Sequence, residues 1–153
     1  MVSIEEANYR LKLSEGFIKE AEEYFRLSHW RSCVSSSQLA VENASKAVLA
    51  LSKPIIKIHD LSKLLIGLLE DEEFPADLSE KIERLAENAR VLGFEEHIRT
   101  DYGDELAYKT PWEIYGPKHA EKALLIARDS HDLSIEIIEK IQLEEKTRES
   151  GGG

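Results

Sequence analysis

The chain has 153 residues, a formal net charge of −10 and a single cysteine, Cys33. This length is typical of one domain, the acidic charge disfavours nucleic-acid binding through a broad basic surface, and one cysteine excludes an intramolecular disulfide or a cysteine-based zinc site. The N-terminal segment carries acidic residues, and no apolar run reaches the roughly 20 residues that cross a bilayer, so we expect a cytoplasmic protein without a membrane span.

The first half of the chain predicts two long helices. Helical spacing of apolar residues indicates a first helix over residues 3–27, which Ser3 and Glu6 would begin as a capping box. A second helix over residues 30–51 has one face of mostly small residues, so another helix backbone could approach it closely. Polar residues four apart occupy its opposite face: Gln38, Glu42 and Lys46. We expect this second helix at the centre of a bundle, with Glu42 and Lys46 paired along it.

The second half predicts shorter helices and a long irregular segment. An extended connector over residues 55–58 should lead into a third helix with Asp60 as its N-cap. A fourth helix over residues 77–92 follows, and Gly93 ends or kinks it. We then expect an irregular segment up to Pro117 and a final helix over residues 118–142. No strand periodicity appears. The fold prediction is therefore all-α, an up-and-down bundle of four to five helices over residues 1–142, followed by a disordered polar tail over residues 143–153.

Several kinds of chemistry lack their sequence motifs. The glycine-rich phosphate-binding patterns and H-E-x-x-H are absent, and no two of the five histidines have the spacing that places metal ligands on one helix turn. His131 near the inward face of the last helix is best interpreted as a structural histidine. We therefore expect no metal and no cofactor.

One pair of residues suggests RNA cleavage without a metal. Arg90 and His97 are seven residues apart, which places both on one helix face if Gly93 does not break the helix. A guanidinium can hold a phosphate and an imidazole can exchange a proton near neutral pH, so this pair is the candidate catalytic group. The alternative is a solvated Arg90 and a His97 that packs in a loop.

A second polar group follows directly in the sequence. It contains Arg99, Asp101 and Tyr102, and it is the candidate nucleotide or phosphate site. The alternative is structural, with an Arg99–Asp101 pair and the nearby tyrosine hydroxyl fixing the irregular segment to the bundle. A long irregular segment within a small helical domain is often functional.

Three segments in order resemble the HEPN family (higher eukaryotes and prokaryotes nucleotide-binding). They are the small-residue helix over residues 36–47, the His59-Asp60-Leu61 start of the third helix, and residues 99–104 followed by 111–115 and the alanine-rich last helix. The resemblance implies a bundle of four to five helices, commonly dimeric and often acting beside a minimal nucleotidyltransferase as one half of a toxin–antitoxin pair.

Some members of that family are metal-independent RNases with an R-x(4–6)-H motif, in which a polar residue usually follows the arginine. Arg90 and His97 have this spacing, but Val91 follows Arg90. Our leading interpretation is therefore a homodimeric, non-catalytic or weakly catalytic component that binds a nucleotide, RNA or a partner protein. The alternatives are a metal-independent RNase and a structural interaction module without a ligand.

Overall fold

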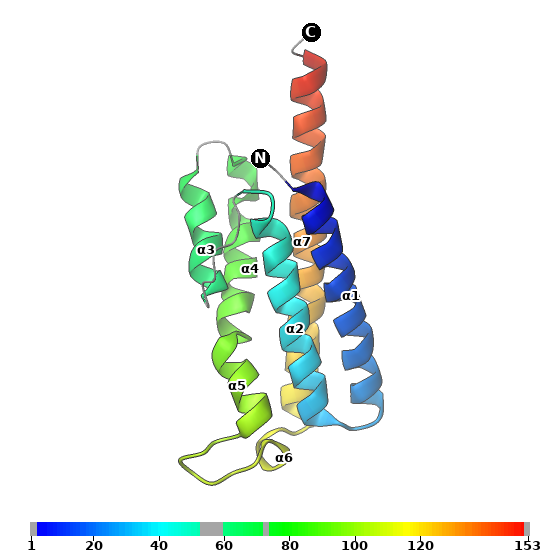
Figure 1. Cartoon of the computed structure of the whole chain (residues 1–153), viewed down its shortest axis with the longest axis vertical. Coiled ribbons are helices and arrows are strands. Elements are labelled where there is room, and N and C mark those ends of the chain that lie inside the picture. Colours follow the sequence, from blue (N-terminus) through cyan, green and yellow to red (C-terminus); the bar gives the residue numbers. More distant parts are fainter. Residues whose placement is uncertain (1–2, 53–59, 72–73, 152–153) are drawn as a thin grey trace.

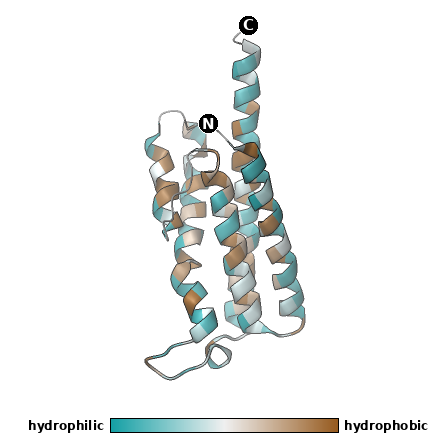
Figure 2. Cartoon of the chain, in the orientation of Figure 1, coloured by the Kyte–Doolittle hydropathy of each residue, from teal (hydrophilic) through white to brown (hydrophobic). Residues whose placement is uncertain are grey.

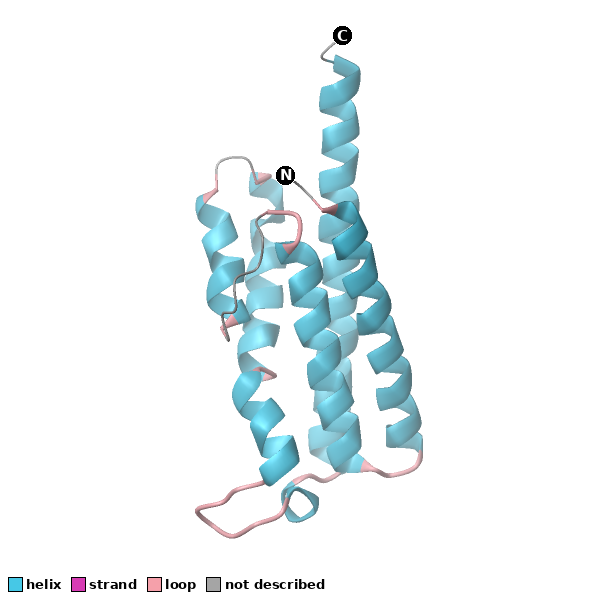
Figure 3. Ribbon diagram, in the orientation of Figure 1, coloured by secondary structure: helices cyan, strands magenta, loops and turns pink. Residues whose placement is uncertain are grey.

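The computed structural model describes residues 3–52, 60–71 and 74–151, and these residues form a bundle of helices (Figures 1 and 3). The helices are α1 (Ile4–Arg26), α2 (Trp30–Leu49), α3 (Leu61–Gly67), α4 (Ser79–Val91), α5 (Phe94–Tyr102), α6 (Pro111–Ile114) and α7 (Pro117–Gly151). The described residues form no strand, only one isolated bridge between Asp104 and Lys109. The all-α bundle is confirmed, whereas the connector over residues 55–58 and His59 lie outside the described residues.

Two predicted helix starts are present as capping interactions. The Ser3 hydroxyl accepts a hydrogen bond from the Glu6 amide at 3.2 Å, and the Asp60 carboxylate accepts one from the Lys63 amide at 3.2 Å. The Glu6 side chain pairs with Arg10 at 2.9 Å, so only one half of the expected capping box forms. Each cap satisfies an amide that lacks a partner in the first helical turn, which fixes where the helix begins.

Helix α2 lies at the centre of the bundle, as its small-residue face predicted, and contacts α1 and each helix from α3 to α7. Ala40 and Ala44 are fully buried, and their backbones are close enough to receive side chains from neighbouring helices. The Ser14 hydroxyl of α1 donates to the Ala40 carbonyl at 2.9 Å, and the Ser134 hydroxyl of α7 donates to the Ala44 carbonyl at 2.8 Å. Small residues on α2 thus let polar side chains bind its backbone.

The polar face predicted for α2 needs one correction. Glu42 and Lys46 form the expected ion pair at 3.6 Å, but Gln38 is buried. The reason is the central position of α2, which leaves little of its circumference to solvent because α3, α4 and α5 cover the side opposite α1 and α7 (Figure 1).

Gly93 separates α4 from α5, and this break positions the candidate site. A Cβ atom at residue 93 would lie 2.6 Å from the Ala89 carbonyl oxygen, so only glycine allows the chain to pass there. Residues 94–102, which we expected to be irregular, form α5 beyond the break. The prediction failed because the segment is too short to show clear helical periodicity on both sides of the glycine.

The last helix is longer than expected. Helix α7 continues from residue 142 to Gly151, where the sequence had suggested a disordered polar tail, and its final turns extend beyond the bundle (Figures 1 and 2). Residues 143–150 contain no proline and are rich in Leu, Glu, Lys and Arg, which all favour helix. Among the described residues, no helix combines the length and the apolarity that a membrane span needs.

Candidate functional site

The start of α2 and the end of α5 bring an arginine and a histidine to the same carboxylate. Arg31 Nη1 donates to the Thr100 carbonyl at 2.9 Å and lies 3.7 Å from Asp101 Oδ1. His97 Nε2 lies 4.0 Å from Asp101 Oδ2, one helical turn earlier on α5. The Arg31–Asp101–His97 cluster therefore joins two residues of α5 to a residue far away in the sequence.

The cluster is partly exposed, so a ligand can reach it. All three side chains retain solvent contact, while His97 Nδ1 is buried and has no hydrogen-bond partner in the part of the chain that the structure describes. The Thr100 hydroxyl donates to the His97 carbonyl at 2.7 Å and strengthens the last turn of α5. Burying an imidazole nitrogen without a partner is unfavourable, but among the described residues Ser37 Oγ, Gln38 Oε1 and Ser45 Oγ of α2 are buried in the same way, so this feature alone does not mark the cluster as functional.

The cluster replaces the expected pair of Arg90 and His97. Gly93 breaks the helix between these residues, so the condition for placing them on one face is not met. Arg90 Nε donates to Glu87 Oε2 at 2.9 Å, an exposed pair on α4, and this hydrogen bond lowers the pKa of the Glu87 carboxyl. No contact joins Arg90 to His97 within the described chain.

The second predicted group is divided between two sides of α5. Asp101 belongs to the cluster, whereas Arg99 and Tyr102 are exposed on the outer side of the helix. Arg99 makes no hydrogen bond or ion pair with the described residues, so the expected Arg99–Asp101 pair does not form. Asp101 instead faces Arg31 and His97.

Other residues fix the segment after α5 to the bundle. The buried Tyr115 hydroxyl donates to Glu96 Oε1 at 2.8 Å, and burial together with this bond raises the pKa of Tyr115 well above its usual range. The His119 ring meets the Tyr115 ring edge-on, and its Nδ1 accepts a hydrogen bond from the Gly116 amide at 3.2 Å. The structural role that we considered for the Arg99 group is thus filled by Tyr115 and Glu96.

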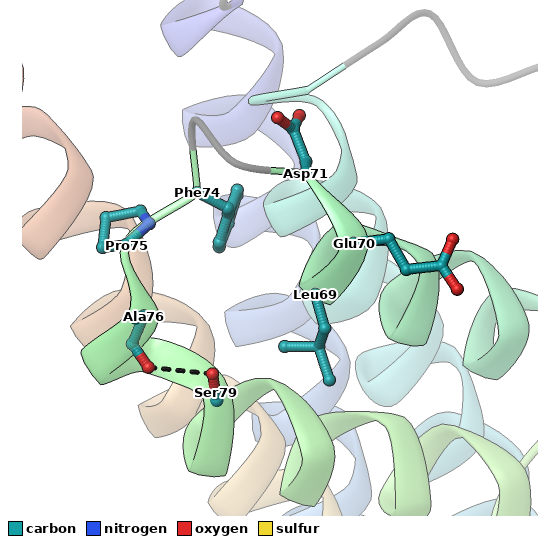
Figure 4. A pocket seen from close by; sticks show the side chains of 7 residues that line it. All are labelled: Leu69, Glu70, Asp71, Phe74, Pro75, Ala76 and Ser79. Atoms are coloured by element: carbon teal, nitrogen blue, oxygen red, sulfur yellow. Dashed lines mark hydrogen bonds between the residues drawn. The ribbon is translucent and has the colours of Figure 1, made fainter.

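A separate pocket lies at the opposite end of the bundle, between the end of α3 and the start of α4 (Figure 4). Its volume is about 290 Å³. The lining residues are Leu69, Glu70, Asp71, Phe74, Pro75, Ala76 and Ser79. They include no basic residue, histidine or cysteine that could bind a phosphate or act as a nucleophile, so we assign the pocket no role.

The described residues contain no group of three or more His, Cys, Asp or Glu side chains that could hold a metal ion. Cys33 is buried, and its burial raises the pKa of the thiol, which disfavours the reactive thiolate. The Arg31–Asp101–His97 cluster combines a permanent cation, a carboxylate and an imidazole, which are groups that can take part in anion binding and proton transfer.

Comparison with known proteins identifies the family. A family model described as "HEPN domain" matches residues 7–138, which is most of the chain. The protein belongs to the HEPN domain family. This HEPN domain also resembles the crystal structure of TT1696 from Thermus thermophilus, with a TM-score of 0.63 and 24% identity over 85% of this chain and 96% of that chain. That likeness supports the fold, and the comparison with curated proteins gave no match.

Sequence reasoning did not find Arg31 as a site residue. It lies 69 residues before Thr100, whose carbonyl it binds, so no local spacing connects it with His97. In this HEPN domain the packing of α2 against α5 brings Arg31 to Asp101, which in turn lies 4.0 Å from His97. The one available signal was its position in the first turn of the helix predicted to be central.

Proposed function

We propose that this HEPN domain binds the phosphate of a nucleotide or RNA at the Arg31–Asp101–His97 cluster, and that it acts as a homodimer. The observation that supports the proposal is that α2 and α5 bring a guanidinium and an imidazole together on one partly exposed surface, each within 4.0 Å of the Asp101 carboxylate that lies between them. Arg31 uses Nη1 for its bond to Thr100, and its other nitrogens make no hydrogen bond with the described residues. They are available for a phosphate oxygen, which guanidinium groups bind in bidentate geometry.

The binding test compares three variants with the wild-type protein. We expect Arg31→Ala to weaken binding of a labelled nucleotide or oligoribonucleotide about tenfold or more, because a hydrogen bond to a charged group contributes about 1.5–3 kcal/mol. His97→Gln is the second variant, since it does not alter the Arg31–Thr100 bond. Arg90→Ala is the matched control, because Arg90 pairs only with the exposed Glu87 among the described residues.

Melting temperatures measured on the same samples separate loss of binding from loss of folding. The proposal is rejected if the folded wild-type protein binds neither nucleotides nor RNA, or if Arg90→Ala weakens binding as much as Arg31→Ala does. A folded protein without any such ligand would instead support the structural interaction module.

Metal-independent RNA cleavage is the second candidate function, and the contact between His97 and Asp101 favours it. Because His97 Nδ1 is buried, Nε2 would take the proton from a ribose 2′-hydroxyl, and the Asp101 carboxylate 4.0 Å away would face the positive charge that forms on the ring. Arg31 would stabilise the negative charge that develops on the phosphate. Incubation of RNA with the protein in the presence of a chelator tests this candidate, and His97→Ala should abolish any cleavage.

The resemblance to the family also supports a partner protein. We propose that a minimal nucleotidyltransferase binds this HEPN domain, as in toxin–antitoxin pairs of the family. Co-expression with such a protein from a neighbouring gene, followed by affinity purification of the tagged HEPN domain, tests the pairing. Recovery of the HEPN domain without the nucleotidyltransferase would count against it.

A further inference from the structure

The segment around α5 exposes an unusual number of large apolar side chains. Twelve such side chains are exposed among the described residues, and more than half of them lie between residues 91 and 112. Those in this segment are Val91, Phe94, Ile98, Tyr102, Leu106, Tyr108 and Trp112. Soluble proteins usually bury or scatter such residues, so a concentration of this kind indicates an interaction surface.

Three of these residues form a stripe along the outer side of α5. Phe94, Ile98 and Tyr102 are spaced four apart and are 46%, 42% and 64% exposed. His97 and Asp101 lie beside this stripe, towards Arg31 of α2, and the His97 ring stacks against the Phe94 ring with centroids 6.5 Å apart. The α5 stripe, Phe94–Ile98–Tyr102, is the side of this helix on which large apolar side chains are most exposed.

Two opposite charges lie beside the α5 stripe. Glu95 and Arg99 are exposed and one helical turn apart, and neither makes a hydrogen bond or ion pair with the residues that the structure describes. This arrangement is self-complementary. In an isologous contact, residue i of one copy meets residue j of the other, and the reverse contact occurs as well.

We infer that a second copy of this chain covers the α5 stripe, with the two α5 helices antiparallel and a two-fold axis at Ile98. In this register Phe94 faces the partner's Tyr102, and Ile98 faces the partner's Ile98. A helix rises about 1.5 Å per residue, so Glu95 and the partner's Arg99 differ by only about 3 Å along the axis. The pairing buries two aromatic contacts and forms two ion pairs between Glu95 and Arg99.

The loop after α5 extends this surface. Asp104 and Lys109 exchange two backbone hydrogen bonds of 2.9 and 3.0 Å, which hold residues 104–109 as a rigid hairpin. The hairpin carries Leu106 and Tyr108, which are 95% and 92% exposed. Antiparallel pairing places it beyond the start of the partner's α5, beside the partner's Val91. Because a stable interface buries about 1,200–2,000 Å² in total, the hairpin supplies area that a nine-residue helix lacks.

The inference rests on the homodimer in the proposed function and identifies its surface. The Arg31–Asp101–His97 cluster borders the stripe, because the His97 ring stacks against the Phe94 ring with centroids 6.5 Å apart. Loss of the dimer and loss of phosphate binding are still measured separately, by mass and by ligand titration.

The decisive experiment exchanges charges beside the stripe of the full chain. At both ion pairs, Glu95→Lys puts a lysine opposite the partner's Arg99. Arg99→Glu instead puts a glutamate opposite the partner's Glu95. We expect each variant alone to have the 17.4 kDa mass of one chain by light scattering, whereas the wild type has about twice that mass. An equimolar mixture of the two variants should restore the dimer, because both pairs then join opposite charges.

A substitution on the axis provides a second measurement. Ile98→Glu puts two carboxylates face to face at the two-fold axis and should give a monomer. Leu125→Glu, at an exposed position of α7, should leave the mass of the dimer unchanged. A wild-type monomer overturns both the inference and the proposed homodimer. A dimer that persists in Ile98→Glu, or a charge mixture that stays monomeric, overturns the α5 contact, while Arg31→Ala still tests phosphate binding.

Discussion

The surroundings of α2 and the outer side of α5 differ in how completely the bundle buries their apolar side chains. Around α2, the hydroxyls of Ser14 and Ser134 bind backbone carbonyls, and apolar side chains fill the remaining space. On α5, Phe94 and Ile98 face solvent although both are large and apolar. The apolar residues around α2 are explained by folding, whereas the outer side of α5 is the surface on which we infer the dimer contact.

The largest effect should come from a cavity in the core. Ile137 of α7 is fully buried, so Ile137→Ala should lower the free energy of unfolding by about 2–5 kcal/mol, because it removes packing and leaves a void. Leu125→Ala, at an exposed position of the same helix, should change it by less than about 0.5 kcal/mol. Equal losses in urea titration would contradict the packing of Ile137 in the core.

A smaller effect is expected where the hairpin leaves α5. Gly103 has a φ of +71°, and a Cβ there would lie 2.1 Å from the Lys109 carbonyl oxygen. Gly103→Ala should therefore destabilise the protein by about 1–3 kcal/mol. Gly16→Ala is the control, since nothing lies within 4 Å of a Cβ at that helical position. Thermal melting measures both variants, and an unchanged Gly103→Ala protein would contradict a rigid hairpin.

The partly buried His131 should make the free energy of unfolding depend on pH. Its Nδ1 is 3.1 Å from the Ser14 hydroxyl, as expected for a structural histidine, and burial lowers the pKa of the imidazole. The unfolded chain therefore takes up a proton first as the pH falls below about 6.5, so stability is full above that pH and declines below it.

The matched variant is His131→Asn, which keeps a donor towards Ser14 but cannot titrate. Melting temperatures measured between pH 5 and pH 8 should decline less steeply for this variant than for the wild type. His29→Asn, at an exposed histidine before α2, is the control. Equal slopes for wild type and His131→Asn would exclude His131 as the origin.

The smallest effect concerns Tyr108, which has a φ of +57° in the hairpin. Asparagine adopts this left-handed conformation more easily than tyrosine, so Tyr108→Asn should stabilise the chain by up to about 1 kcal/mol. The same variant removes an exposed aromatic residue from the inferred interface and should weaken the dimer. Dilution experiments by light scattering would show this, and unchanged dimer affinity would remove the hairpin from the interface.

The sequence alone determined the helical class, the central position of α2, the caps Ser3 and Asp60, and the family. These features depend on spacing within one or two helical turns or on motifs read in order. The structure corrected two predictions. Gln38 is buried because neighbouring helices cover it, and α7 continues to Gly151 because its last residues favour helix although their polar composition had suggested disorder.

Only the tertiary structure decided which groups meet at the candidate site. The sequence paired His97 with Arg90 because both lie in one segment, but a break at Gly93 separates them, and α2 supplies Arg31 from the other half of the fold. Periodicity shows which side of a helix a residue occupies, not which helix packs against that side. The arginine of the cluster therefore depends on the packing of α2 against α5, which no local pattern in the chain encodes.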